Sequence, residues 1–167
     1  MAAAEAVLKR PALGFFLLLT LAAPPSTRAA EGLAIVGATV FDGTGAPALA
    51  DAVVVVLKET ISSVGPRSRV ALPKGIPYVD GRGLFVVPGR VGRPSVAAAL
   101  RERVRSGAAF ERALADVLGT EAATPSDGTI KPGGPADLVV LDKDPRTSMD
   151  PLGAVKRTYV KGREVVP

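Results

Sequence analysis

Short apolar runs alternate with turn residues from residue 33 to residue 89. The runs are rich in Val, Leu and Ile and occupy residues 34–36, 39–41, 53–57, 61–64, 78–80 and 84–87. Runs of this length bounded by Gly, Pro and Asp are typical of β-strands. The run at 53–57 is apolar without alternation, so it predicts a strand that is covered on both faces.

A different period governs residues 94–119, where apolar positions recur at helical spacing. These positions are Val96, Leu100, Val104, Phe110, Leu114 and Val117. Gly107 lies between the two halves of this stripe and is expected to interrupt the helix. Arginines occupy the opposite face, where Glu102, Glu111 and Asp116 dilute their charge. This mixture favours a solvated face over a membrane-binding or nucleic-acid-binding one.

Strand-like runs return near the end of the chain, at residues 137–141, 157–160 and 164–166. Lys161, Gly162 and Arg163 supply a turn between the last two runs. The order of strands, helical stretch and strands predicts a mainly β fold with one helical segment.

The composition supports one domain of ordinary size with an aliphatic core. Of the 167 residues, 47% are hydrophobic but only 4% are aromatic, and the formal net charge is +5. This positive excess is mild, and no aromatic side chain lies among the helix arginines to stack on bases. We therefore expect no nucleic-acid partner.

The sequence contains neither histidine nor cysteine. Disulfides are excluded, and the imidazole ligands of a hydrolytic zinc site and the commonest general base are missing. Asp137, Asp142 and Asp144 lie close together in the sequence, but they flank one apolar strand and its Asp-Pro turn, which favours a structural role. No catalytic, cofactor-binding or metal-binding residue is predicted.

Residues 1–29 have the pattern of a secretory signal peptide. Lys9 and Arg10 precede an apolar run at 12–23, which is too short to span a bilayer comfortably. Thr27 and Ala29 place small residues at the −3 and −1 positions of a cleavage site. An uncleaved anchor and a buried helix are the alternatives. We expect a cleaved, exported protein, periplasmic or extracellular, with no stable membrane span after cleavage.

Two groups of motifs resemble opposite ends of the metal-dependent amidohydrolase superfamily, especially exported members similar to imidazolonepropionase and Xaa-Pro dipeptidases. The first group is GATVFDGTG at 37–45, DAVVVV at 51–56, ISSVG at 61–65, VDGRG at 79–83 and VVPG at 86–89. The second is GTIKPGGPADLVVLDKDP at 128–145 and VKRTYVKGREV at 155–165.

The resemblance implies a composite β-sandwich, in which residues 30–89 and 128–167 pair with one another. In the family this sandwich lies beside a catalytic (β/α)₈ barrel, which needs roughly 250 residues. Here only the helical linker at 90–127 separates the two segments. The family continues from VVPG into a barrel strand with a His-x-His pair that binds one or two divalent metals, typically zinc. This chain has Arg90, Val91, Gly92 and Arg93 instead.

These departures predict a truncated or degenerate amidohydrolase that is inactive by itself. The alternative is a stand-alone β-sandwich that serves as a binding or assembly module. Loss of the barrel also predicts an uncovered sandwich face, through which the protein would self-associate or pair with a partner. The family reaction is hydrolysis of C–N bonds, and its substrate specificity resides in barrel loops that this chain lacks.

Overall fold

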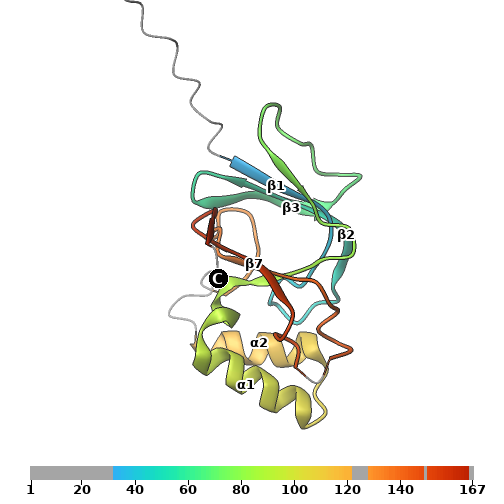
Figure 1. Cartoon of the computed structure of the whole chain (residues 1–167), viewed down its shortest axis with the longest axis vertical. Coiled ribbons are helices and arrows are strands. Elements are labelled where there is room, and N and C mark those ends of the chain that lie inside the picture. Colours follow the sequence, from blue (N-terminus) through green and yellow to red (C-terminus); the bar gives the residue numbers. More distant parts are fainter. Residues whose placement is uncertain (1–31, 122–127, 149, 166–167) are drawn as a thin grey trace, which may run out of the picture.

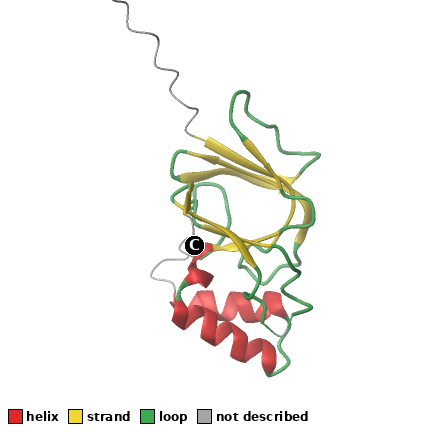
Figure 2. Ribbon diagram, in the orientation of Figure 1, coloured by secondary structure: helices red, strands yellow, loops and turns green. Residues whose placement is uncertain are grey.

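A computed structural model describes residues 32–121, 128–148 and 150–165 (Figure 1). The predicted signal peptide at 1–29 lies outside the described residues. The strands are β1 (Gly32–Val40), β2 (Leu49–Leu57), β3 (Thr60–Pro66), β4 (Tyr78–Asp80), β5 (Phe85–Pro88), β6 (Leu138–Leu141), β7 (Val155–Val160) and β8 (Arg163–Val165). The helical elements are the 3₁₀ turn η1 (Gly89–Gly92) and the helices α1 (Pro94–Arg105) and α2 (Phe110–Glu121). The predicted mainly β class is confirmed (Figure 2).

The eight strands of the described residues belong to one mixed sheet, in which seven follow the order β3-β2-β1-β5-β6-β7-β8 and β4 pairs with β1 off this path. β4 and β5 both run parallel to β1, β4 along residues 34–36 and β5 along residues 39–40. β5 then pairs antiparallel with β6, which joins the N-terminal and C-terminal segments. The prediction that these segments share one sheet system is therefore confirmed. The direct neighbours of β6 are β5 and β7, whereas strands of residues 33–64 reach it only across the core.

The segment before β6 closes the sheet on itself. Ile61 of β3 exchanges two backbone hydrogen bonds with this segment, since its N–H donates to the Gly134 carbonyl at 2.9 Å and its carbonyl accepts from Gly133 N–H at 2.8 Å. The Gly162 N–H, at the β7–β8 turn, donates to the Ala136 carbonyl at 2.9 Å. The result is one continuous sheet that folds over a central core, rather than two separate sheets.

The central core consists of aliphatic side chains from both halves of the sheet. It includes Ile35, Val54 and Val56 from the first half, and Leu138 and Val140 of β6, all at most 1% exposed. Because β2 alternates its side chains, Val53 and Val55 point to the opposite face, where Val70 and Ile76 of the β3–β4 loop cover them. The prediction that the run at 53–57 is covered on both faces is confirmed for its four valines, while Leu57 is exposed.

The helical stretch packs on the outer face of β5 and β6. Val87, Val139 and Leu141 form one buried cluster with the helical stripe. The stripe residues in this cluster are Val96, Leu100, Phe110, Leu114 and Val117, as their spacing predicts, and the partly buried Val104 packs against it. Gly107, with φ +92°, ends α1 and separates it from α2. No helix in the described ranges is long and apolar enough to cross a membrane.

The two short runs predicted at 34–36 and 39–41 form one strand, β1. Gly37 joins them with φ +84°, a left-handed conformation that favours glycine, and the pairing of β1 with β2 shifts register there. The sequence pattern gives two runs at this point because Gly37 and Ala38 interrupt the larger apolar side chains. Pairing with neighbours on both sides carries the strand through the irregularity.

Candidate functional site

The N-terminal and C-terminal segments meet where β5 ends and β6 begins. Gly89 N–H donates to the Asp137 carbonyl at 2.8 Å. A Cβ atom on Gly89 would lie 2.7 Å from the Asp137 carbonyl carbon, closer than side chains tolerate. Glycine at this position therefore allows the two backbones to touch, which gives the last residue of the VVPG motif a packing role.

Beyond Gly89 the chain leaves the sheet. Residues 89–92 form the 3₁₀ turn η1 and lead directly into α1. Val91 is buried on the helical side, Arg90 is half-buried and Arg93 is exposed. The motif resemblance places a barrel strand with metal-binding histidines here, whereas this chain has a turn with two arginines.

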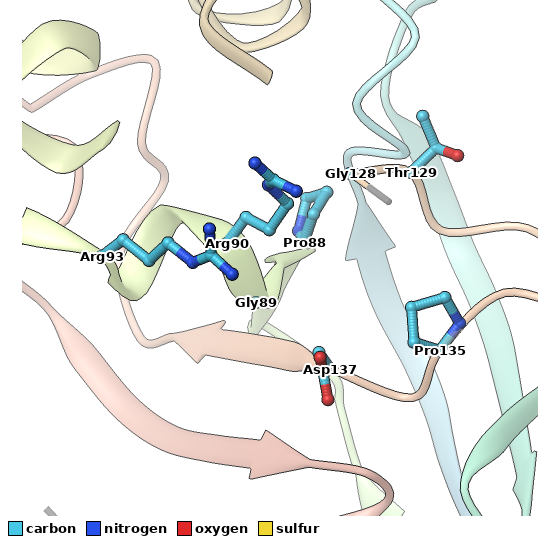
Figure 3. A pocket seen from close by; sticks show the side chains of 8 residues that line it. All are labelled: Pro88, Gly89, Arg90, Arg93, Gly128, Thr129, Pro135 and Asp137. Atoms are coloured by element: carbon cyan, nitrogen blue, oxygen red, sulfur yellow. The ribbon is translucent and has the colours of Figure 1, made fainter. Parts of the chain in front are cut away.

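A cleft of about 230 Å³ lies beside this turn (Figure 3). Its wall is formed by Pro88, Gly89, Arg90, Arg93, Gly128, Thr129, Pro135 and Asp137. In Figure 3 the two arginine side chains lie on one side, and Pro135 and Thr129 on the other. The Thr129 hydroxyl is buried without a hydrogen-bond partner in the described part of the chain. With two guanidinium groups and one carboxylate, the wall carries a formal charge of +1.

The three aspartates for which the sequence predicts a structural role, Asp137, Asp142 and Asp144, lie before and after β6. Asp137 and Asp142 lie at opposite ends of the four-residue strand β6, about 16 Å apart at 3.3 Å per residue. Asp137 Oδ1 accepts the Lys161 backbone N–H at 2.7 Å, which fixes the β7–β8 turn. Within residues 32–121, 128–148 and 150–165, no group of three or more acidic, His or Cys side chains is arranged to hold a metal ion.

Asp144, the third of these aspartates, forms an ion pair with Arg146. Arg146 Nη2 lies 2.6 Å from Asp144 Oδ2, and Arg146 Nε donates to Oδ1 at 2.9 Å. The Arg146 hydrogen bonds lower the pKa of the Asp144 carboxyl, although partial burial opposes them. The Arg146 guanidinium also lies 5.5 Å from the ring centre of Phe41, so this pair stabilises the β6–β7 loop against the core.

The Asp-Gly-Thr-Gly motif at 42–45 has an equally structural explanation. Asp42 Oδ1 accepts both the N–H and the hydroxyl of Thr44, at 2.8 and 2.7 Å. A Cβ on Gly43, whose φ is +84°, would lie 2.6 Å from the Gly128 carbonyl oxygen. Ile130 N–H donates to the Asp42 carbonyl at 2.8 Å. The motif therefore joins β1 to the segment that leads into β6.

A second arginine–aspartate pair lies at the turn between β4 and β5. The Arg82 side chain donates to both carboxylate oxygens of Asp80, and its Nη2 reaches Oδ2 at 2.6 Å. These hydrogen bonds lower the pKa of Asp80 to about 2. Both side chains are exposed, so the pair shapes a surface turn.

No known family model and no curated protein sequence matches the chain. Partial structural similarity exists to phenylurea hydrolase B, with 33% identity over 35% of this chain and 13% of that chain, at a TM-score of 0.33. A putative prolidase from Bifidobacterium longum matches with 24% identity over 44% of this chain and 21% of that one, at 0.32. Molinate hydrolase matches with 19% identity over 61% and 29%, at 0.34. The chain thus spans less than a third of each of these structures.

The cleft at residues 90 and 93 is the feature that sequence reasoning missed. In the sequence, Arg90 and Arg93 lie where the resemblance implies histidines, and this departure by itself predicts only that metal ligands are missing. That these arginines line a cavity depends on the contact between Gly89 and Asp137, which are 48 positions apart in the sequence.

Proposed function

We propose that this chain is the composite β-sandwich of an amidohydrolase whose catalytic barrel has been lost, and that it has no hydrolase activity by itself. The observation that carries this proposal is the junction between β5 and β6. It brings the two motif groups, at 37–89 and 128–165, into one sheet, as the family resemblance implies.

The chemistry of the chain agrees with an inactive product. In the family, a divalent metal lowers the pKa of a bound water and polarises the carbonyl that is attacked. This sequence has no histidine or cysteine to bind such a metal. At the position where the resemblance expects the first ligands, Arg90 and Arg93 present permanently positive groups, which repel a cation.

The test is an activity and metal assay on the purified full chain. With added Zn²⁺, Mn²⁺ or Co²⁺ we expect no turnover of dipeptides, N-acyl amino acids or cyclic amides above a metal-only control. After dialysis we expect far less than one zinc per chain by elemental analysis. Metal-dependent turnover together with stoichiometric zinc would overturn the proposal.

Export belongs to the same proposal. If residues 1–29 are a cleaved signal peptide, the secreted protein begins near Ala30. Intact-mass measurement on protein recovered from the periplasm or medium tests this. An exported or membrane-associated protein that retains Met1 would contradict cleavage.

A second candidate, the stand-alone module, is favoured by the packing of α1 and α2. The outer face of β5 and β6 does not remain bare, since Val87, Val139 and Leu141 are at most 2% exposed beneath the helices. The large hydrophobic side chains that are exposed in the described ranges are Leu57, Leu72, Tyr78, Val155, Val160 and Val165. A short form with its own helical cover is what selection for independent folding would produce.

Solution behaviour separates these two candidates. A barrel-less remnant is expected to self-associate or bind a hydrophobic dye at micromolar concentration, because apolar surface without its partner is sticky. A stand-alone module that folds independently is expected to be a monomer by light scattering, with no dye binding and one cooperative thermal transition. The second result would favour the module over the remnant.

A further inference from the structure

We propose that the cleft beside η1 binds a small oxyanion, a carboxylate or a phosphate, through Arg93 and Arg90. This site is independent of the proposed loss of hydrolase activity, because the two arginines that would bind the anion lie outside both motif groups and take no part in hydrolysis. It also reverses the chemistry expected at this point of the chain, where the resemblance predicts ligands for a cation.

The shape of the cleft is suited to a small ligand. Its volume of about 230 Å³ exceeds that of a phosphate or acetate ion, so part of a larger molecule also fits. Pro88 and Pro135 add rigid apolar wall. Because these side chains have little freedom to lose, ligand binding costs little conformational entropy there.

The charges on the wall favour an anion. Arg93 lies on the same side of the cleft as Arg90 (Figure 3), and it forms no ion pair with any described residue. A guanidinium offers five N–H donors in a planar fork that matches two oxygens of a carboxylate or phosphate. The one acidic residue, Asp137, already uses Oδ1 to accept the Lys161 N–H at 2.7 Å, so it is directed in part toward the β7–β8 turn.

The direct test is titration of the purified full chain with sodium phosphate, acetate and N-acetylglycine, each at constant ionic strength. Binding is followed by calorimetry or by backbone NMR shifts. We expect saturable binding in the millimolar range or tighter, with shifts centred on residues 89–93 and 128–137. Phosphate as the tightest ligand indicates a phosphorylated molecule, and N-acetylglycine as the tightest indicates a chain-terminal carboxylate. Failure of all three anions to saturate would overturn the proposal.

Two variants with opposite expected effects on the Kd, together with one control variant, test whether the anion binds in this cleft. Arg93→Gln is expected to raise the Kd at least fivefold, because it removes one charged fork. Asp137→Asn keeps the acceptor for Lys161 N–H but removes the negative charge, so it is expected to lower the Kd about twofold to fivefold. Arg112→Gln changes the net charge equally, at an exposed position of α2 outside the cleft, and is expected to leave the Kd unchanged.

The pattern across these variants decides between specific and diffuse binding. An equal rise in Kd for Arg93→Gln and Arg112→Gln would mean that anions respond only to net charge, which overturns the site. The same conclusion follows if Asp137→Asn leaves the Kd unchanged while its thermal transition matches that of the parent protein. These readouts involve no hydrolysis, so failure here is distinguishable from failure of the proposed function.

Discussion

The two outer faces of the folded sheet are covered in different ways. The face of β5 and β6 lies beneath two helices, whose buried side chains form a cluster with Val87, Val139 and Leu141. The face of β1 and β2 lies beneath the irregular loop at 67–77, where only Val70 and Ile76 pack on four buried residues. Both covers exclude water from the valines of the sheet, but the helical cover involves many more buried side chains than the loop.

This difference shows where the stability of the short chain resides. Hydrophobic stabilisation scales with the apolar area that is buried, so the helical cover contributes far more than the loop. The helices occupy the linker at 90–127, between the two segments that form the sheet. We infer that the helices are the main cover of the sheet, and that the loop at 67–77 is a smaller, local cover over strands that also pair with one another.

The largest effect is expected from substituting a glycine on the helical side. Gly43→Ala adds a Cβ that lies 2.6 Å from the Gly128 carbonyl oxygen and 2.9 Å from Leu118 Cδ1, at a residue with φ +84°. Overpacking and left-handed strain together are expected to lower the free energy of unfolding by about 4 kcal/mol. Urea unfolding followed by circular dichroism measures this.

Gly75→Ala is the matched control on the loop side. Gly75 has a similar φ of +80°, but no atom lies within 4 Å of the added Cβ. Only the conformational strain remains, so the expected loss is about 1 to 2 kcal/mol. Equal losses for the two variants would show that Gly43 is not packed between β1 and the segment before β6.

Truncation of one core side chain in each cover sharpens the comparison further. Leu100→Ala removes a fully buried side chain of α1 and is expected to cost about 3 kcal/mol. Val70→Ala removes a partly buried side chain of the loop and is expected to cost less than about 1 kcal/mol. Thermal and urea unfolding measure both, and a larger loss for Val70→Ala would reverse our ranking of the two faces.

The smallest effects concern the two arginine–aspartate pairs, one on each half of the molecule. In both, the folded protein lowers the pKa of the aspartate, for Asp80 from 3.8 to about 2. A lowered pKa means that the pair stabilises the protein above about pH 4, and that this contribution is lost as the pH falls toward the folded-state value. Stability is therefore expected to decline between pH 4 and pH 2.

Substitution of each aspartate distinguishes the two pairs. Asp144→Asn is expected to cost about 0.5 to 1 kcal/mol at pH 7, because its partner Arg146 also contacts the ring of Phe41. Asp80→Asn is expected to have a smaller effect, because water screens an exposed pair. Each variant is expected to flatten the acid decline of the urea midpoint. If the acid decline is unchanged in both variants, other carboxylates cause the loss of stability at low pH.

Local patterns were sufficient to predict most of the elements. Unbroken valines at 53–56 predicted a strand covered on both faces, and the spacing of Val96 and Leu100 predicted which side of the helix is buried. Side-chain periodicity carries this information because it reflects which positions must leave water. The absence of histidine and cysteine likewise determined, from the sequence alone, that no imidazole or thiolate metal ligand exists in the chain.

The tertiary structure decided the rest, since pairing over long sequence separations leaves no periodic signal. It merged two predicted runs into β1 through Gly37, and it placed β6 between β5 and β7 instead of beside the strands of residues 33–64. It also turned a sequence departure at Arg90 and Arg93 into the wall of a cleft, because the contact between Gly89 and Asp137 positions the opposite wall. Which residues face one another across a cavity depends on backbone approach, and only the folded chain determines that.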